Sequence, residues 1–228
     1  MSTTAPRADD HILFVGDIQG SHGPLTRLLK CSGFNPDKHQ LIPLGDTINR
    51  GPANLATLKT LHGIGATPIV GNHELGVLEG YRSKSLPSWL KRQTVAKDLF
   101  RDRQVDAWID WIASWPTFLI GPGYIAVHAG LHPVLSLLET PDSFLTRVRI
   151  CNRKGELPSN WDGLNHSFPR AYHPWHRWYR GRKHVFYGHW ARMGVCHGER
   201  TTGLDSGCVY GNPLSAIWFP SMRMVQSN

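Results

Sequence analysis

The sequence lacks any long apolar run. No apolar segment approaches the roughly 20 residues that a membrane-spanning helix requires. The first ten residues contain no apolar stretch after a basic one, as a secretory signal would. We therefore expect no membrane partner and a cytoplasmic location. Residues 1–10 are expected to form a flexible N-terminus and residues 11–228 a single domain, because a chain of this length can bury one large core.

Cysteine is scarce as well. The four cysteines are far apart and contain no C-x-x-C pair, which favours reduced thiols over a disulfide framework. The sequence has no G-x-x-x-x-G-K-[ST] loop, which argues against an ATP-driven motor or kinase, and no G-x-S-x-G elbow, which leaves a serine hydrolase without support. Charged residues make up only 18% of the chain and hydrophobic ones 40%, a composition typical of a packed globular protein.

The charge that is present has a positive excess. Lys and Arg number 25 against 17 Asp and Glu, which gives a formal net charge of +8. Such an excess attracts polyanions, so nucleotides, RNA or phosphoproteins are candidate partners. A solvated basic face explains the same excess equally well, and charge alone does not decide between the two.

Short apolar runs alternate with helical patterns along the chain. Apolar spacing predicts one helix that starts near Pro24 and ends before Gly33, a second around 55–61, and a mostly helical segment over 87–115. Strands are expected at 12–15, 40–44, 67–70, 117–120, 124–127, 184–187, 202–204 and 214–219. Strands that alternate with helices predict a layered α/β fold.

Five polar, glycine-containing clusters each follow one of these strands. They lie at 16–20, 45–51, 71–74, 128–130 and 188–190. Ligands bind beyond the carboxyl ends of the strands in α/β sheets, so clusters far apart in sequence are expected to converge there. Each residue taken singly has an ordinary explanation as a cap or a hydrogen-bonded core group. The five clusters together predict one site.

The side chains of these clusters suit divalent metal ions. Carboxylate, amide and imidazole groups are contributed by Asp17, Asp46, Asn72, His128 and His189. A carboxylate such as Asp46 can bridge two ions about 3.5–4 Å apart, an arrangement that activates water for phosphoryl transfer. The pattern therefore predicts a phosphohydrolase with two divalent ions.

The clusters resemble the sequence blocks of the calcineurin-like metallophosphoesterases, in particular their phosphoprotein-phosphatase branch. The resemblance covers about residues 12–211 and implies a sandwich of two mixed β-sheets flanked by helices. It is closer to the symmetrical bis(5'-nucleosyl)-tetraphosphatases, which carry Thr-Arg-x-Arg and Asp-x-Gly-Cys-x-x-Gly segments. This chain has Thr146-Arg147-Val148-Arg149 and Asp205-Ser206-Gly207-Cys208-Val209-Tyr210-Gly211 in those places.

The resemblance implies which residues hold each metal ion. One ion would be held by Asp17 and the residue at position 19, and Asp46 would bridge to a second ion held by Asn72, His128 and His189. Position 19 is Gln19, whose amide lacks charge, so the first site is expected to bind its ion more weakly or to favour Mn or Mg. Mn, Mg and Co are the candidates for the two ions. His22 is an alternative ligand nearby.

The same resemblance implies the catalytic and substrate-binding residues. His73 would donate a proton to the leaving oxygen, with Asn49 in place of the Asp that usually orients it. Guanidinium groups match phosphate oxygens, so Arg50 and Arg147 are the expected phosphate clamps. Arg149 is the alternative to Arg147, and Asn72 is expected to contact substrate as well as metal.

The stretch 172–180 interleaves aromatic rings with cations. A base could stack on Trp175 and Trp178, although packing of these rings against the sheet explains them as well. Tyr210, in the Asp-x-Gly-Cys-x-x-Gly segment, is a further substrate-binding candidate.

Three functions are consistent with the sequence. The favoured one is symmetrical hydrolysis of diadenosine tetraphosphate and related dinucleoside polyphosphates to nucleoside diphosphates. A serine/threonine phosphoprotein phosphatase is the first alternative, favoured by Glu74 where many tetraphosphatases have Asp. The second is a non-catalytic nucleotide- or RNA-binding module, suggested by Gln19 and Asn49. An RNA 5' end or a phosphoprotein is an alternative substrate, and no stable nucleic-acid complex is expected.

Overall fold

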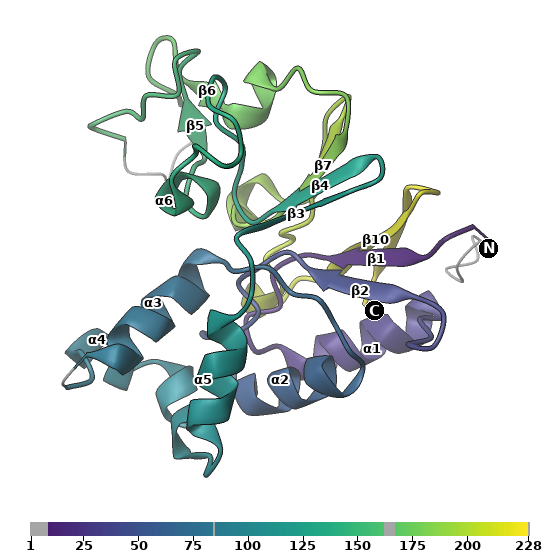
Figure 1. The fold of residues 1–228 in the computed structure, drawn as a ribbon, viewed down its shortest axis with the longest axis vertical. Helices are drawn as coiled ribbons and strands as arrows, with labels where there is room; N and C mark the ends of the chain where they lie inside the picture. The colour runs from purple at the N-terminus through teal and green to yellow at the C-terminus, as the bar shows by residue number, and fades with distance from the viewer. Residues whose placement is uncertain (1–8, 84, 162–166, 228) are drawn as a thin grey trace.

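Two mixed β-sheets form the centre of the molecule (Figure 1). The computed structural model describes residues 9–83, 85–161 and 167–227, so most of the expected flexible N-terminus lies outside it. The first sheet has the order β11-β10-β1-β2, formed by Arg223–Gln226, Ser215–Phe219, Ile12–Val15 and Gln40–Pro43. The second has the order β3-β4-β7-β9-β8, formed by Phe118–Gly121, Tyr124–Val127, His184–Tyr187, Thr201–Gly203 and Cys196–His197.

Apolar side chains from the inner faces of the two sheets form the central core. Phe14 of β1 is fully buried and stacks on Phe186 of β7, with ring centroids 4.1 Å apart. Tyr124 and Phe219 meet Phe14 edge to face. Because successive strand residues point to opposite faces, Leu13 of the same strand instead packs toward the helices. The contact between the sheets therefore fixes β1 beside β7.

Helices cover the outer face of the first sheet and form a lobe beside it. Helix α1 (His22–Ser32) packs against the first sheet through Leu25 and Leu28. The helical lobe in the lower part of Figure 1 comprises α2 (Asn54–Gly63), α3 (Asn72–Arg82), α4 (Ser88–Lys91), η1 (Thr94–Ala96), η2 (Leu99–Arg101) and α5 (Val105–Ala113). Among the described residues, no helix is long and apolar enough to cross a membrane.

Short elements cover the outer face of the second sheet. They are α6 (Asp142–Leu145), β5 (Ile150–Cys151), β6 (His173–Pro174) and η3 (Trp175–Trp178). Two more turns of 3-10 helix, η4 (Ala191–Met193) and η5 (Cys208–Tyr210), follow the ends of β7 and β9. The α/β sandwich with two mixed sheets confirms the expected fold class.

Two expected elements differ from the structure. Segment 67–70 is not a strand, although the N–H groups of Thr67 and Ile69 donate to the carbonyls of Leu41 and Pro43 in β2. Pro43 has no N–H with which to donate back, so the ladder stays incomplete. The expected helical segment 87–115 is broken near Asp98, whose carboxylate accepts from the backbone N–H groups of Asn54, Leu55 and Leu99.

The packing of Phe14 yields a prediction about stability. Phe14→Ala leaves a cavity between the sheets, so we expect the free energy of unfolding to fall by about 3–5 kcal/mol. Chemical denaturation followed by circular dichroism measures this change. Ile120→Ala is the matched control, because Ile120 lies in β3 with 56% of its surface exposed and should change stability little. An equal loss in both variants would contradict the role of the inter-sheet core.

Candidate metal centre and catalytic site

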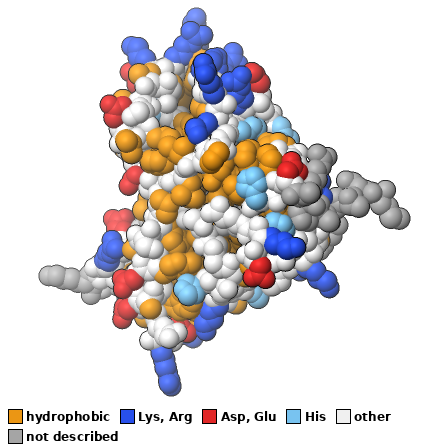
Figure 2. Space-filling view, turned by 45° about the vertical axis from the view of Figure 1, so that its right-hand side comes forward, with side chains coloured by type: hydrophobic (Ala, Val, Ile, Leu, Met, Phe, Trp, Pro, Cys, Tyr) orange, Lys and Arg blue, Asp and Glu red, His pale blue; other side chains and the backbone are white. Residues whose placement is uncertain are grey.

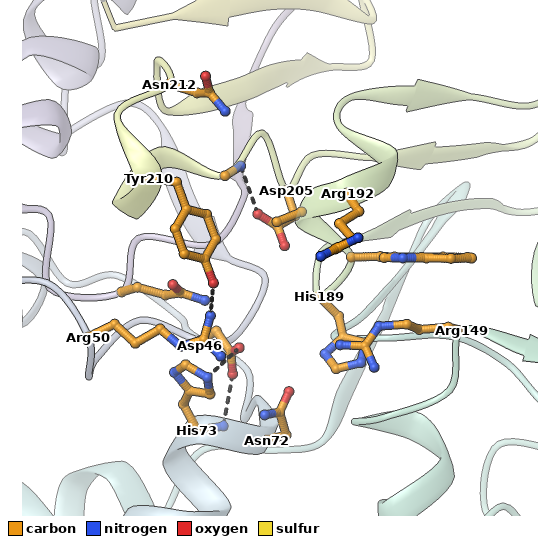
Figure 3. A pocket seen from close by; sticks show the side chains of 14 residues that line it. Asp46, Arg50, Asn72, His73, Arg149, His189, Arg192, Asp205, Tyr210 and Asn212 are labelled. Carbon is orange, nitrogen blue, oxygen red and sulfur yellow. Dashed lines mark hydrogen bonds and ion pairs between the residues drawn. The ribbon is translucent and has the colours of Figure 1, made fainter. Parts of the chain in front are cut away.

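The five polar clusters meet at one edge of the sandwich. Strands β1 and β2 are parallel in the first sheet, as are β4, β7 and β9 in the second, and each is followed by a residue of the site. A cavity of about 500 Å³ opens at this edge (Figure 3). Its lining residues are Gln19, Asp46, Arg50, Asn72, His73, Arg149, His189, Trp190, Ala191, Arg192, Asp205, Gly207, Tyr210 and Asn212.

Three buried residues at this edge form a compact group of metal-ligand atoms. One atom each from Asp46, His128 and His189 lies within 4.8 Å of the others. The Nδ1 of His128 donates to the carbonyl of Leu44 at 2.8 Å, which leaves Nε2 facing Asp46 Oδ1 at 3.3 Å and Asn72 Oδ1 at 3.2 Å. A carbonyl oxygen can only accept a hydrogen bond, so Nδ1 carries the proton. The unprotonated Nε2 then directs its lone pair toward the other metal-ligand atoms.

His189 is oriented by backbone groups in the same manner. Its Nε2 donates to the carbonyl of Arg147 at 3.1 Å, which leaves Nδ1 for the cluster. Its own N–H donates to Asp17 Oδ1 at 3.0 Å. The strand-end loops of the two sheets are thus tied together at the site.

Asp17 and Gln19 supply buried oxygen atoms with no hydrogen-bond partner. Asp17 Oδ2 and Gln19 Oε1 are both orphaned in this way among the described residues. An unpaired buried oxygen is costly unless a cation or donor meets it, so both atoms fit a bound metal ion. His22 does not line the cavity, and its Nε2 contacts Thr60 Oγ1 at 2.9 Å. The structure therefore brings Gln19, and not His22, to the site.

Burial and charge shift the pKa values of these groups in opposite directions. Burial raises the pKa of Asp17 well above its usual value, and the nearby Asp205 and Asp46 raise it further. Burial would also raise the pKa of Asp46, but His128 and His73 lower it below the usual range. Burial, followed by the charge of His128, places the pKa of His189 well below normal. Burial lowers the pKa of His128, but the adjacent Asp46 outweighs burial and raises it above the usual value. The site therefore buries carboxyl and imidazole groups whose charges depend on one another.

The backbone of the site is strained. Seven non-glycine residues have positive φ in the described part of the chain, and five of them lie in the strand-end loops that form the site: Gln19 at 48°, Asp46 at 45°, Asn49 at 76°, Arg50 at 62° and His189 at 73°. Such conformations cost free energy and occur often at functional sites. At Gly188, an added Cβ would lie 2.1 Å from Asp17 Oδ1, so only glycine permits this approach.

Glu74 holds the loop that carries Asp46, a role that the sequence did not reveal. Its fully buried carboxylate accepts from the N–H groups of Asp46, Thr47, Ile48 and Gly71 at 2.8–3.1 Å. Burial raises the pKa of Glu74 to about 7, and the backbone donors oppose this rise. Because the side chain binds backbone and does not line the cavity, it does not discriminate between a nucleotide and a phosphoprotein substrate.

His73 lines the cavity beside Asp46. Its Nε2 is 3.6 Å from Asp46 Oδ2, and its N–H donates to Asp46 Oδ1 at 2.9 Å. Burial lowers the pKa of His73. Asn49 does not hold this imidazole as expected, because Asn49 Oδ1 accepts from the N–H of Arg50 and His73 Nδ1 has no partner among the described residues. The positive φ of Asn49 turns its side chain back on its own loop.

The structure places two of the three candidate phosphate-binding arginines at the cavity. Arg50 and Arg149 line the cavity, as does Arg192, which the sequence reasoning missed. The exposed Arg147 lies in the turn after α6 and borders a neighbouring hollow with Leu157, which Arg149 borders as well. Only the backbone carbonyl of Arg147 reaches the site, through His189.

The tryptophans expected to stack on a base lie elsewhere. Trp175 is only 2% exposed and packs against Tyr187 in the core, and Trp178 donates its indole N–H to the carbonyl of Cys151. Neither borders the cavity. Tyr210 does, with 64% of its surface exposed, and its hydroxyl accepts a hydrogen bond from Arg50. Trp190, which also lines the cavity, was not expected from the sequence.

The net positive charge of the protein arises from one segment of the chain. Residues 147–200 contain eleven Lys and Arg against three Asp and Glu, while the remainder has fourteen of each kind. The whole formal excess of +8 therefore belongs to this segment. It includes Arg149 and Arg192 of the cavity. Lys and Arg side chains are prominent over the upper part of the molecule in Figure 2.

The fold and the donor atoms define a class of protein, the metal-dependent phosphoesterases. Residues 11–193 match the calcineurin-like phosphoesterase family, so the chain is a hydrolase that belongs to this family. Proteins of the family use divalent metal ions. The match favours the enzyme interpretation over a non-catalytic binding module.

Individual relatives share most of the chain. It is 30% identical to the symmetrical bis(5'-nucleosyl)-tetraphosphatase of Chromobacterium violaceum, over 90% of this chain and 91% of that protein. The enzyme of the same name from Methylococcus capsulatus is 29% identical over 90% of each chain. A crystal structure provisionally identified as a diadenosine tetraphosphatase has a TM-score of 0.78 at 26% identity, covering 97% and 94% of the two chains.

A protein phosphatase shares the fold alone. The serine/threonine phosphatase from Saccharomyces cerevisiae has a TM-score of 0.58 at 17% identity, covering 97% of this chain and 81% of that one. This likeness carries no conclusion about substrate.

The four hydrogen bonds of Glu74 give a second prediction. In Glu74→Gln, either orientation of the amide points an NH₂ group at two backbone N–H donors, so we expect the free energy of unfolding to fall by about 2–4 kcal/mol. Thermal and urea denaturation of metal-free protein measure the change. Glu79→Gln, an exposed position in the same helix α3, is the control and should leave stability unaltered. Equal stability of Glu74→Gln and the wild type would contradict this role.

Proposed function

We propose that this chain hydrolyses dinucleoside tetraphosphates symmetrically to two nucleoside diphosphates, using two divalent metal ions. The observation that supports this substrate most directly is the placement of arginines on both sides of the metal-ligand cluster. In Figure 3, Arg50 lies on one side of Asp46 and His189, and Arg149 and Arg192 lie on the other. A phosphate monoester has one phosphate to bind, whereas a bridge of four phosphates extends in both directions. The names of the relatives agree with this choice.

The residues fit two ions with one shared carboxylate. We assign Asp17, Gln19 and Asp46 to the first, and Asp46, Asn72, His128 and His189 to the second. The mixture of carboxylate, amide and imidazole donors suits Mn, Mg or Co. When bound, such ions supply a water nucleophile and offset charge on the phosphoryl oxygens.

The remaining polar residues bind the substrate and move protons. Arg50 and Arg149 bind phosphates on either side of the scissile bond, because a guanidinium offers paired donors to phosphate oxygens. The hydroxyl of Tyr210 accepts from Arg50 and holds that guanidinium at the cavity. His73, which lies between Arg50 and Asn72 in Figure 3, donates a proton to the leaving phosphate oxygen.

This proposal predicts both metal dependence and a cleavage position. Protein treated with a chelator should be inactive on diadenosine tetraphosphate and regain activity with Mn, Mg or Co. Chromatography should then show ADP as the only nucleotide product. AMP and ATP as products would contradict symmetrical cleavage of the four-phosphate bridge. A phosphoserine peptide, assayed in parallel, should react far more slowly, and faster turnover of the peptide would favour the protein phosphatase alternative.

The revised clamp gives a further prediction. Arg149→Ala should lower kcat/KM for diadenosine tetraphosphate about ten- to a hundredfold, as expected for the loss of one charged hydrogen bond of about 1.5–3 kcal/mol. Arg147→Ala is the matched control, since it keeps the carbonyl that orients His189 and removes a guanidinium outside the cavity. Steady-state kinetics distinguish the two. A larger loss in Arg147→Ala would restore the assignment made from sequence.

A further inference from the structure

Asp205 is a buried carboxylate at the site with no role in the proposed set of ligands. It follows β9 after one residue, Leu204, just as His189 follows the neighbouring strand β7 after Gly188. Only 3% of its surface is exposed, and it lines the same cavity as Gln19. Its Oδ1 accepts from the N–H of Gly207 at 3.0 Å, which fixes the carboxylate at the end of the strand.

Asp205 lies against Asp17. The two carboxyl groups interact directly, and both are also close enough to Asp46 for electrostatic repulsion. The backbone requires this proximity, because a Cβ on Gly16 would lie 2.2 Å from the carbonyl oxygen of Leu204. In the described ranges, neither Asp17 nor Asp205 forms an ion pair with Lys or Arg within 4.0 Å, although the charge of Arg149 acts on both from a greater distance. Two carboxylates in contact with no paired cation are unfavourable unless a positive charge joins them.

Two other oxygens point to where that charge belongs. Asp17 Oδ2 and Gln19 Oε1 are buried and have no hydrogen-bond partner among the described residues. Only 3% of the surface of Asp17 and 5% of that of Gln19 is exposed. These are oxygens of the first metal ion in the proposed function. Gln19 contributes no charge to that ion, whereas a carboxylate at Asp205 would.

We infer that Asp205 is a carboxylate of the first metal site and supplies the negative charge that Gln19 lacks. The inference rests on the proposed two-metal function. Hard and borderline divalent ions are held mainly by carboxylate oxygens, and ligand charge sets their affinity. The Asp-Ser-Gly turn at 205–207 thereby gains a function in metal binding.

Asp205→Asn tests this inference through metal binding. Calorimetry with Mn²⁺ on chelator-treated protein should show two sites in the wild type. In Asp205→Asn, one site should weaken at least tenfold while the other keeps its affinity. The metal-free variant should melt no lower than metal-free wild type, because a repulsive carboxyl contact has been relieved, yet gain less thermal stability when Mn²⁺ is added. Asp37→Asn, at an exposed position, is the control for loss of one negative charge.

A second variant tests compensation of charge. Gln19→Glu in the Asp205→Asn background should recover tight binding at the weakened site, and failure to recover would overturn the compensating role. Unchanged affinity at both sites in Asp205→Asn would overturn the inference alone. So would a lower melting temperature of the metal-free variant with an unaltered gain from Mn²⁺, which indicates a purely structural residue. A wild-type protein that binds no Mn²⁺ would overturn the proposed function as well.

Discussion

Contact between the inner faces of the two sheets is the constraint from which the site follows. Stacking of Phe14 on Phe186 sets β1 and β7 side by side, so both strands end at the same edge. The loop after β7 can then donate from the N–H of His189 to Asp17, and Gly188 permits the close approach. Residues separated by more than 170 positions thus become neighbours through apolar packing away from the chemistry.

The site itself opposes folding. It buries carboxylates with few counterions and holds residues such as Gln19 and Asp46 at positive φ, both of which cost free energy. Glu74 offsets part of this cost by accepting four backbone hydrogen bonds from the Asp46 loop and the start of α3. The rest is offset by the core, so stability and chemistry are supplied by different parts of the molecule.

Much of the fold and the set of converging residues could be predicted from the sequence, because strand runs and the polar clusters after them are local patterns. The strand at 184–187 matches β7 at both ends. Directions of individual side chains were not predictable. Arg147 and Arg149 are two residues apart in a turn and a bend, and the sequence does not show that only Arg149 reaches the cavity. Trp175 is aromatic and cation-flanked like a stacking residue, yet its burial depends on a sheet formed by distant segments. Glu74 and Asp205 lie in segments that the sequence marks, but their main neighbours, the Asp46 loop and Asp17, are remote in sequence, so their contacts could not be predicted.

The confinement of excess charge to residues 147–200 gives the molecule an electric polarity. This segment attracts anions and the rest of the chain is neutral on balance, so a polyanionic ligand experiences a torque as well as an attraction while it diffuses inward. Arg149 and Arg192 belong to the charged segment and lie at the cavity, so the field leads to the arginines that border it. Counterions shorten the reach of this field to about 10 Å at 0.1 M salt. Capture of the ligand is therefore governed by ionic strength, separately from the bond-breaking step at the strand ends.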